Sequence, residues 1–319
     1  MRGMRVLVLT ALTVLGAAVV AGEAVQRPAA TPAPTPSAVT PSVTVPPMSA
    51  MDRLAGPARV ADLEVMSFNL RFASITPPHS WGQRRPVTRA LLAAERPDLI
   101  GTQEGLAIQL RDIESDLGPD YDRIGTGRDP GGLGEHMEIF YNRTRLRPRG
   151  HGHFWLSETP DVPGSTSWQS HRVRMVTWVL FADERTGGRF YAVNTHLDNV
   201  SETARRHSAR LITDRLAGLA PLPIVLTGDF NSPAEPSGEV YRVLTVEAGL
   251  RDSWTAPVRG PAWGTIHNYD PLIPDGERDD WILTSPGVTV RAALMNTHQQ
   301  GGQYPSDHLP IQARLRLPS

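Results

Sequence analysis

Short apolar runs alternate with amphipathic segments from about Leu63 to the end of the chain. The apolar runs predict strands, which occupy residues 63–69, 98–103, 138–142, 176–182, 189–195, 222–227, 281–284, 288–293 and 311–317. Helical spacing of apolar residues predicts helices over 106–117, 201–216 and 237–248. A further helix is expected to begin at Pro86, because proline is favoured in the first helical turn. This alternation, with a Gly187-Gly188 hairpin signal, indicates an α/β or α+β sandwich built on mixed sheets.

The first fifty residues have a different pattern. Arg2 and Arg5 precede an apolar stretch from Val6 to Ala21, which predicts a secretory signal peptide over residues 1–24. The stretch is shorter than the ~20 residues that span a bilayer, and an uncleaved membrane anchor is the alternative. Residues 25–51 are rich in Pro, Ala and Thr and predict an extended linker. We therefore expect a secreted protein whose one folded domain covers residues 52–319.

Composition excludes several kinds of chemistry. The 319 residues include no cysteine, so disulfides, thiolate metal sites and a cysteine nucleophile are excluded. All 32 basic residues are arginine, which also excludes Schiff-base chemistry and a P-loop lysine. Without the first fifty residues, 29 arginines face 32 acidic residues, so the expected domain has a net charge of −3.

Polar side chains suited to metals follow four of the predicted strands. They lie in Ser67–Asn69, Gln103–Gly105, Asn194–Asp198 and Gly228–Asn231, and a fifth set, Pro305–Pro310, precedes the last strand. Any one of these sets alone is typical of a turn or a helix cap. Their coincidence at strand ends favours one site assembled from several loops. Carboxylate and amide oxygens suit Mg²⁺ or Mn²⁺ better than zinc.

The order of these motifs resembles that of the endonuclease/exonuclease/phosphatase superfamily, whose members include deoxyribonuclease I. The resemblance covers about residues 62–317. It is closest to a bacterial branch without a settled substrate, through Gly125–Tyr141, Phe154–Ser165, Thr195–Ile212 and Tyr304–Ile311. The resemblance implies a four-layered sandwich, in which two mixed β-sheets are flanked by helices. It also implies one pocket that holds a divalent metal, normally Mg²⁺.

The resemblance assigns roles to eight residues. Glu104 matches the main metal ligand, with Asn69 and Asp307 nearby. His308 matches the catalytic histidine, and Asp280 matches the aspartate that orients it, with Asp279 as the alternative. Asp229 and Asn231 match the pair that positions the attacking water and binds phosphate, and His196 matches a donor to a phosphate oxygen. Which residue acts as the general base stays open.

These residues predict a secreted, Mg²⁺-dependent phosphoesterase that acts as a monomer without a stable protein partner. An extracellular nuclease is the alternative enzyme, and a catalytically silent domain that binds a phosphorylated ligand is the alternative outside enzymes. The absence of lysine and the negative charge favour a small phosphoester over long duplex DNA.

Two further groups of residues have open roles. One alternating set would share a face on a strand, either as a basic cluster at the cleft or as an exposed edge: Arg143, Arg145, Arg147 and Arg149. A second group either shapes the substrate pocket or ties loops together: Arg71, Arg128, Glu135, Trp155 and Arg174.

Overall fold

The computed structural model describes residues 48–318, so the predicted signal peptide and most of the predicted linker lie outside the described residues. The described part begins with a short helix, α1 (Ala50–Ala55), whose N-terminus is capped by the Ser49 hydroxyl. Met51 of this helix is buried with Ala292 and Leu294, so packed structure begins slightly before Asp52. Within residues 48–318, we find no helix with the length and apolar character needed to cross a bilayer.

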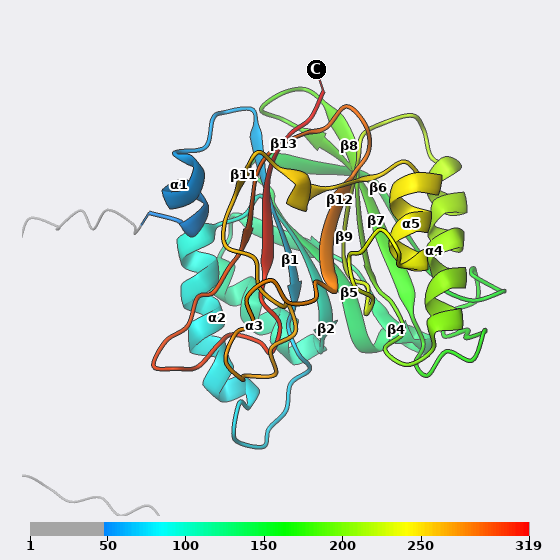
Figure 1. The fold of residues 1–319 in the computed structure, drawn as a ribbon, viewed down its shortest axis with the longest axis horizontal. Coiled ribbons are helices and arrows are strands. Elements are labelled where there is room, and N and C mark those ends of the chain that lie inside the picture. Colours follow the sequence, from blue (N-terminus) through cyan, green and yellow to red (C-terminus); the bar gives the residue numbers. More distant parts are fainter. Residues whose placement is uncertain (1–47, 319) are drawn as a thin grey trace, which may run out of the picture. The chain divides into compact units, whose positions relative to one another are not determined.

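Two mixed β-sheets form the centre of the fold (Figure 1). The eight-stranded sheet has the order β11 (Val258–Arg259), β13 (Thr289–Met295), β14 (Ile311–Arg316), β1 (Asp62–Asn69), β2 (Leu99–Gly105), β5 (Leu133–Asn142) and β3 (Tyr121–Ile124), with β4 (Gly127–Asp129) also beside β5. The six-stranded sheet has the order β10 (Arg251–Asp252), β12 (Asp280–Thr284), β9 (Ile224–Asp229), β8 (Arg189–His196), β7 (Met175–Asp183) and β6 (Leu146–Trp155). Parallel pairing joins β1 to β2, β8 to β9 and β11 to β13, and the other pairs are antiparallel.

Helices cover the outer face of each sheet, so the predicted four-layered sandwich is confirmed (Figure 1). The eight-stranded sheet packs against α2 (Trp81–Glu95) and α3 (Ala107–Leu117), which bury Leu91 and Leu110. The six-stranded sheet packs against α4 (Glu202–Ala217), α5 (Glu239–Arg242) and the π-helical turn η2 (Val243–Glu247). Short 3₁₀ turns, η1 (Pro130–Gly132) and η3 (Ser253–Thr255), complete the elements.

Alternate residues of β1 pack into different layers, as the two-residue period of a strand requires. Leu63 and Val65 lie in the core between the two sheets, whereas Met66 and Phe68 pack with α2 and α3. Every second residue of β1, counted from Leu63, therefore faces the opposite sheet, and Asn69 is the last of these residues. The sheets approach closely at Gly101, where a Cβ atom would lie 2.0 Å from the Thr227 hydroxyl oxygen.

Some element boundaries differ from the predictions. The helix expected to begin at Pro86 begins at Trp81, because Ser80 and Gln83 form a capping box before Pro86 is reached. Pro86 therefore lies inside α2. The helix predicted over 237–248 is divided into α5 and the wider turn η2. Strands β3, β4 and β6 were not predicted, since none of them is a continuous apolar run.

Arg145 does not share a face with the other alternating arginines, so the expectation of a basic cluster of four at the cleft is wrong, whereas the exposed-edge alternative holds for Arg147 and Arg149. Arg145 is fully buried and pairs with Asp98 and Asp183, both at 2.8 Å. Arg147 and Arg149 are exposed on β6, an edge strand, and lie near Glu184. Arg145 is buried because its guanidinium pairs with these two buried carboxylates. The alternating arginines therefore form no basic cluster at the cleft.

Candidate active site

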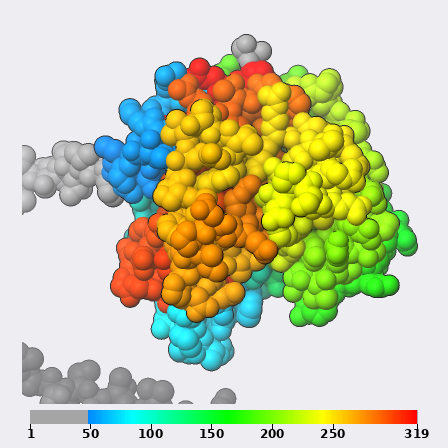
Figure 2. Space-filling model, viewed as in Figure 1, coloured from blue at the N-terminus to red at the C-terminus, as the bar shows by residue number. Residues whose placement is uncertain are grey.

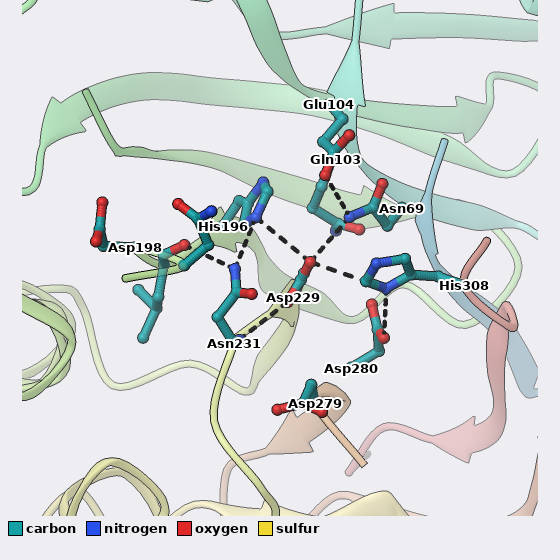
Figure 3. Close-up of polar contacts among 12 residues, drawn as sticks. Asn69, Gln103, Glu104, His196, Asp198, Asp229, Asn231, Asp279, Asp280 and His308 are labelled. Atoms are coloured by element: carbon teal, nitrogen blue, oxygen red, sulfur yellow. Dashed lines mark hydrogen bonds and ion pairs between the residues drawn. The ribbon is translucent and has the colours of Figure 1, made fainter. Parts of the chain in front are cut away.

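Three of the predicted site residues form a row across three neighbouring strands of the six-stranded sheet. Asp229 ends β9, and its partners in register are His196 on β8 and Asp280 on β12. Directly opposed residues have Cβ atoms ~5 Å apart and the same facing, so the three side chains meet between the sheets. Figure 3 shows them converging, with Asp229 in the centre. The loops around this end of the sheets leave an indentation between the gold and orange segments and the green segments (Figure 2).

Asn69 and Glu104 reach the same place from the eight-stranded sheet. Asn69 ends β1, and its side-chain nitrogen donates to Glu104 Oε1 at 3.1 Å and to Asp229 Oδ2 at 2.8 Å. Regular alternation along β2 would turn Glu104 away from Gln103 and out of the site. Instead, Glu104 has a φ of 61° and lies in an irregularity of the pairing between β2 and β5. This local distortion re-aims the carboxylate toward Asn69.

His308 is held by Asp280. Its Nδ1 lies 2.9 Å from Asp280 Oδ2 and 3.9 Å from Asp229 Oδ2. Burial alone would lower the pKa of His308, but the carboxylates of Asp280 and Asp229 hold it well above its usual value. Asp279, the alternative partner, is buried with its pKa raised to about 6 by burial and by Asp280, and no hydrogen bond joins it to His308. The structure therefore pairs His308 with Asp280.

His196 and Asn231 form the other side of the site. Asn231 Nδ2 donates to His196 Nε2 at 2.9 Å and to the Leu197 carbonyl at 3.0 Å, while the Asn231 backbone N–H donates to Asp229 Oδ1 at 2.9 Å. Burial, together with the positive charge of Arg174, holds the pKa of His196 well below its usual value. Its Nε2 also lies 3.3 Å from Asp229 Oδ2, so the ring stands between the Asn231 amide and the central carboxylate.

Asp307 is turned toward a neighbouring arginine. Its Oδ2 lies 3.3 Å from Arg71 Nη1, and Arg71 also lies over the ring of Tyr269 at 5.0 Å. Of the eight predicted residues, the other seven are linked by the polar contacts of Figure 3, and the Asp307 carboxylate is paired with Arg71 instead.

The carboxylate and imidazole side chains of the site suit a divalent cation. Ligand atoms of Glu104, His196 and Asp229 lie within 4.8 Å of one another, as do those of Asp229, Asp280 and His308. Glu104 and Asp229 converge on the Asn69 amide, and neither makes an ion pair with an arginine in the described part of the chain. Two converging carboxylates without a compensating arginine suit Mg²⁺ or Mn²⁺. In this arrangement Asn69 presents its nitrogen to them, because its Oδ1 accepts from the Arg71 N–H at 2.8 Å.

Arg84 is an organising residue that the sequence did not reveal. It is fully buried, and its guanidinium donates to the carbonyl oxygens of five residues: Leu70, Arg71, Phe72, His79 and Pro305. These carbonyls belong to the loop after Asn69 and to the segment before Asp307, and the Phe72 N–H in turn donates to Glu104 Oε2 at 3.1 Å. The available signal was its place on the buried face of α2, four residues before Thr88 and seven before Leu91.

The buried charges predict how metal-free stability depends on pH. Burial and the neighbouring Asp280 raise the pKa of Asp229 from 3.8 to about 7, so ionisation of Asp229 destabilises the fold progressively as pH rises from about 4 to 7. The raised pKa of His308 acts in the same direction, because its stabilisation is complete below pH ~6.5 and is lost as pH rises through the folded value.

Below pH ~6.5 the lowered pKa of His196 opposes this trend, so the clear range lies above it. We therefore expect the melting temperature of chelated protein to fall by ~3 °C between pH 6.5 and pH 8. The Asp229→Asn variant should show a flatter dependence, since it lacks one of the two groups. A melting temperature that rises over this range, or an unchanged slope in the variant, would contradict this electrostatic description.

Comparisons with known proteins agree with this geometry. The model of the Endonuclease/Exonuclease/phosphatase family matches residues 66–308. A family protein from Bacteroides thetaiotaomicron has a similar structure, with a TM-score of 0.75, 35% identity, and coverage of 81% of this chain and 98% of that one. A mannosyl-6-phosphatase from the same bacterium has a TM-score of 0.73 and 36% identity, with coverage of 79% and 99%.

A viral relative gives a shorter match. An uncharacterized protein of Acanthamoeba polyphaga mimivirus is 31% identical over 185 residues, which are 54% of this chain and 67% of that protein. The family match and the two bacterial structures confirm the resemblance seen in the motifs. The chain belongs to the endonuclease/exonuclease/phosphatase family.

Proposed function

We propose that this protein is a secreted, divalent-metal-dependent phosphoesterase that hydrolyses small phosphoesters. The observation that carries the proposal is the meeting of Glu104, Asn69, Asp229, His196 and the Asp280–His308 pair at one end of the two sheets. Family membership supports hydrolysis of phosphoester bonds as the reaction type. The presence of the metal-suited carboxylates and of His308 argues against a catalytically silent domain.

Each residue has a part that its contacts support. Glu104 would hold the metal with Asn69 and Asp307 nearby, and the metal would supply a Lewis acid that offsets charge on the phosphoryl oxygens. Asp229 and Asn231 would position the attacking water, since the Asp229 carboxylate lies at the centre of the site. His196 would donate a hydrogen bond to a phosphoryl oxygen. Asp280 would fix the tautomer of His308 and stabilise its charged form while His308 exchanges a proton.

A small phosphomonoester, such as a sugar phosphate, is the substrate class that we favour. A structure named as a mannosyl-6-phosphatase is 36% identical to this chain and covered almost completely by it. Arg145, Arg147 and Arg149 also form no basic cluster at the site, because Arg145 is buried and Arg147 and Arg149 lie near Glu184. Binding of a long DNA duplex requires several phosphate contacts from basic residues.

A salt series distinguishes small substrates from nucleic acid. We expect hydrolysis of small phosphomonoesters to change by less than about threefold between 50 and 200 mM NaCl, because few charges form the contact. A nuclease with 6–10 phosphate contacts would lose about 10³- to 10⁵-fold in DNA affinity over that range. Fast nicking of plasmid DNA that collapses with salt, without turnover of small substrates, would favour the nuclease instead.

Export is a further part of the proposal. When the full-length gene is expressed, we expect a mature protein in the medium that begins between about Gly22 and Gln26. N-terminal sequencing or intact-mass measurement of the protein in the medium tests this. Recovery of full-length protein in the membrane fraction alone would favour the uncleaved anchor.

A further inference from the structure

Arg174 is a buried guanidinium that has one hydrogen-bond partner. The residue directly precedes β7 and is 5% exposed. Its Nη2 donates to Asn199 Oδ1 at 3.2 Å, but Nε and Nη1 have no partner among residues 48–318. Charged side chains are rarely buried without pairing, because removing a charge from water is costly unless something compensates it. The unpaired N–H groups of Arg174 therefore need a partner from outside the described chain.

The carboxylates around Arg174 are engaged elsewhere. Glu135 accepts both terminal nitrogens of Arg128, at 2.6 and 3.1 Å. Asp198 accepts hydrogen bonds from Ser170 Oγ, from the Arg172 backbone N–H and from two backbone N–H groups of its own loop. Asp229 faces Asn69 and the two site histidines. Glu135 is therefore paired with Arg128, and the charge of Arg174 has no carboxylate partner among these three residues.

Arg174 lies beside the strand end that carries His196. Antiparallel pairing brings Val176 opposite Thr195, so the residues before β7 lie next to the residues after β8. Accordingly, the pKa of His196 is lowered first by burial and next by the positive charge of Arg174. His196 Nδ1 is itself buried and has no partner among the described residues. Arg174 and His196 therefore each have buried nitrogens without a partner among residues 48–318.

We propose that Arg174, together with His196, is an anion-binding pocket that receives the terminal oxygens of a substrate phosphomonoester and selects such dianions over phosphodiesters. The proposal rests on the proposed phosphoesterase function and adds a residue that determines specificity. A phosphomonoester carries close to two negative charges at pH 7 and three terminal oxygens, whereas a diester carries one charge and two such oxygens. A permanently charged guanidinium with unused N–H groups gains more from the dianion.

Binding of inorganic phosphate tests the pocket directly. Calorimetric titration of the purified protein with phosphate at pH 8 should give a dissociation constant that Arg174→Met raises by ~10- to 100-fold. Arg174→Lys should bind with intermediate affinity, because it keeps the charge and loses the fixed fork of donors. Arg189→Gln is the matched control, since it removes one exposed arginine at the opposite end of β8 and should leave the affinity unchanged. Phosphate binding that is absent in the wild type, or equal in Arg174→Met, would overturn the proposal.

Stability separates this role from a structural one. Arg174→Met removes a buried charge that lacks an ionic partner, so its melting temperature should equal or exceed that of the wild type. A structural arginine would instead leave its partners unpaired and lower the melting temperature. If Arg174→Met does not fold, Arg174→Gln keeps a donor for Asn199 and can be titrated in its place. Loss of stability with unchanged phosphate affinity would contradict the proposed pocket.

Turnover of matched substrates tests the selectivity. For the wild type, we expect kcat/KM to be higher with p-nitrophenyl phosphate than with bis(p-nitrophenyl) phosphate. Arg174→Met should lower the monoester value at least ~10-fold more than the diester value. Equal losses on both substrates would overturn the assignment. If the wild type hydrolyses neither these compounds nor any other phosphoester in Mg²⁺, the proposed phosphoesterase function fails, while the phosphate titration still decides whether Arg174 binds the anion.

Discussion

Replacing Glu104 by glutamine is expected to lower kcat/KM for any phosphoester substrate by at least ~10³-fold. Glu104 is the carboxylate that the structure brings to the Asn69 amide from the eight-stranded sheet, at 3.1 Å, opposite Asp229. Glutamine preserves the shape of the side chain but loses the negative charge that attracts Mg²⁺. Titration of Mn²⁺ into the variant should show affinity lowered in parallel with activity.

Glu184→Gln provides the control for this change. Glu184 is exposed and lies near Arg147 and Arg149 on an edge of the other sheet, where ion pairs contribute little to stability. Its replacement should leave kcat/KM and Mn²⁺ affinity within about twofold of the wild type. A Glu104→Gln variant that keeps most of its activity and its metal affinity would exclude Glu104 as the metal ligand.

The Asp280→Asn variant is expected to lose about 10²- to 10⁴-fold in kcat, with the fold intact. Asparagine can occupy the same space, but it neither stabilises the charged form of His308 nor fixes its tautomer through Nδ1, which lies 2.9 Å from Asp280. The pH profile of the variant should also shift, because the carboxylates of Asp280 and Asp229 are what hold the pKa of His308 well above its usual value.

A double-mutant cycle shows whether the two residues act together. Asp280→Asn combined with His308→Ala should cost little more than His308→Ala alone, as for other groups that act as one unit. Asp279→Asn is the matched control, because this neighbouring carboxylate makes no hydrogen bond to His308 and should change kcat by less than about threefold. Additive losses for Asp280 and His308, or a large loss for Asp279, would show that the pairing is wrong.

The parts of the fold that local pattern determines were predictable. Strands β1, β8 and β9 are apolar runs that end at polar residues, so Asn69, His196 and Asp229 could be placed at strand ends from the sequence. Their shared facing follows from the two-residue period once the strands pair. The family resemblance supplied the four-layered sandwich of two mixed sheets and the gathering of the motifs in one pocket, which local pattern does not contain.

The features that escaped prediction depend on tertiary contacts. Glu104 points into the site through a positive φ of 61°, which nothing in its neighbouring residues requires. Arg145 and Arg84 are buried because carboxylates or backbone carbonyls from distant segments surround them. Arg71 and Arg174 had two open roles at the sequence level, and their contacts favour the site: Arg71 pairs with Asp307, and Arg174 stands unpaired beside His196.

Metal-dependent release of phosphate from small substrates tests the proposed chemistry most directly. The purified protein should be assayed on a panel of phosphomonoesters and phosphodiesters in Mg²⁺, after excess EDTA, and after Mg²⁺ is restored. We expect turnover of at least one small phosphomonoester, its loss by ~10³-fold or more in EDTA, and its recovery with Mg²⁺ or Mn²⁺. Full activity in excess EDTA, or no hydrolysis of any phosphoester in Mg²⁺, would contradict a metal-dependent phosphoesterase built on Glu104 and the Asp280–His308 pair.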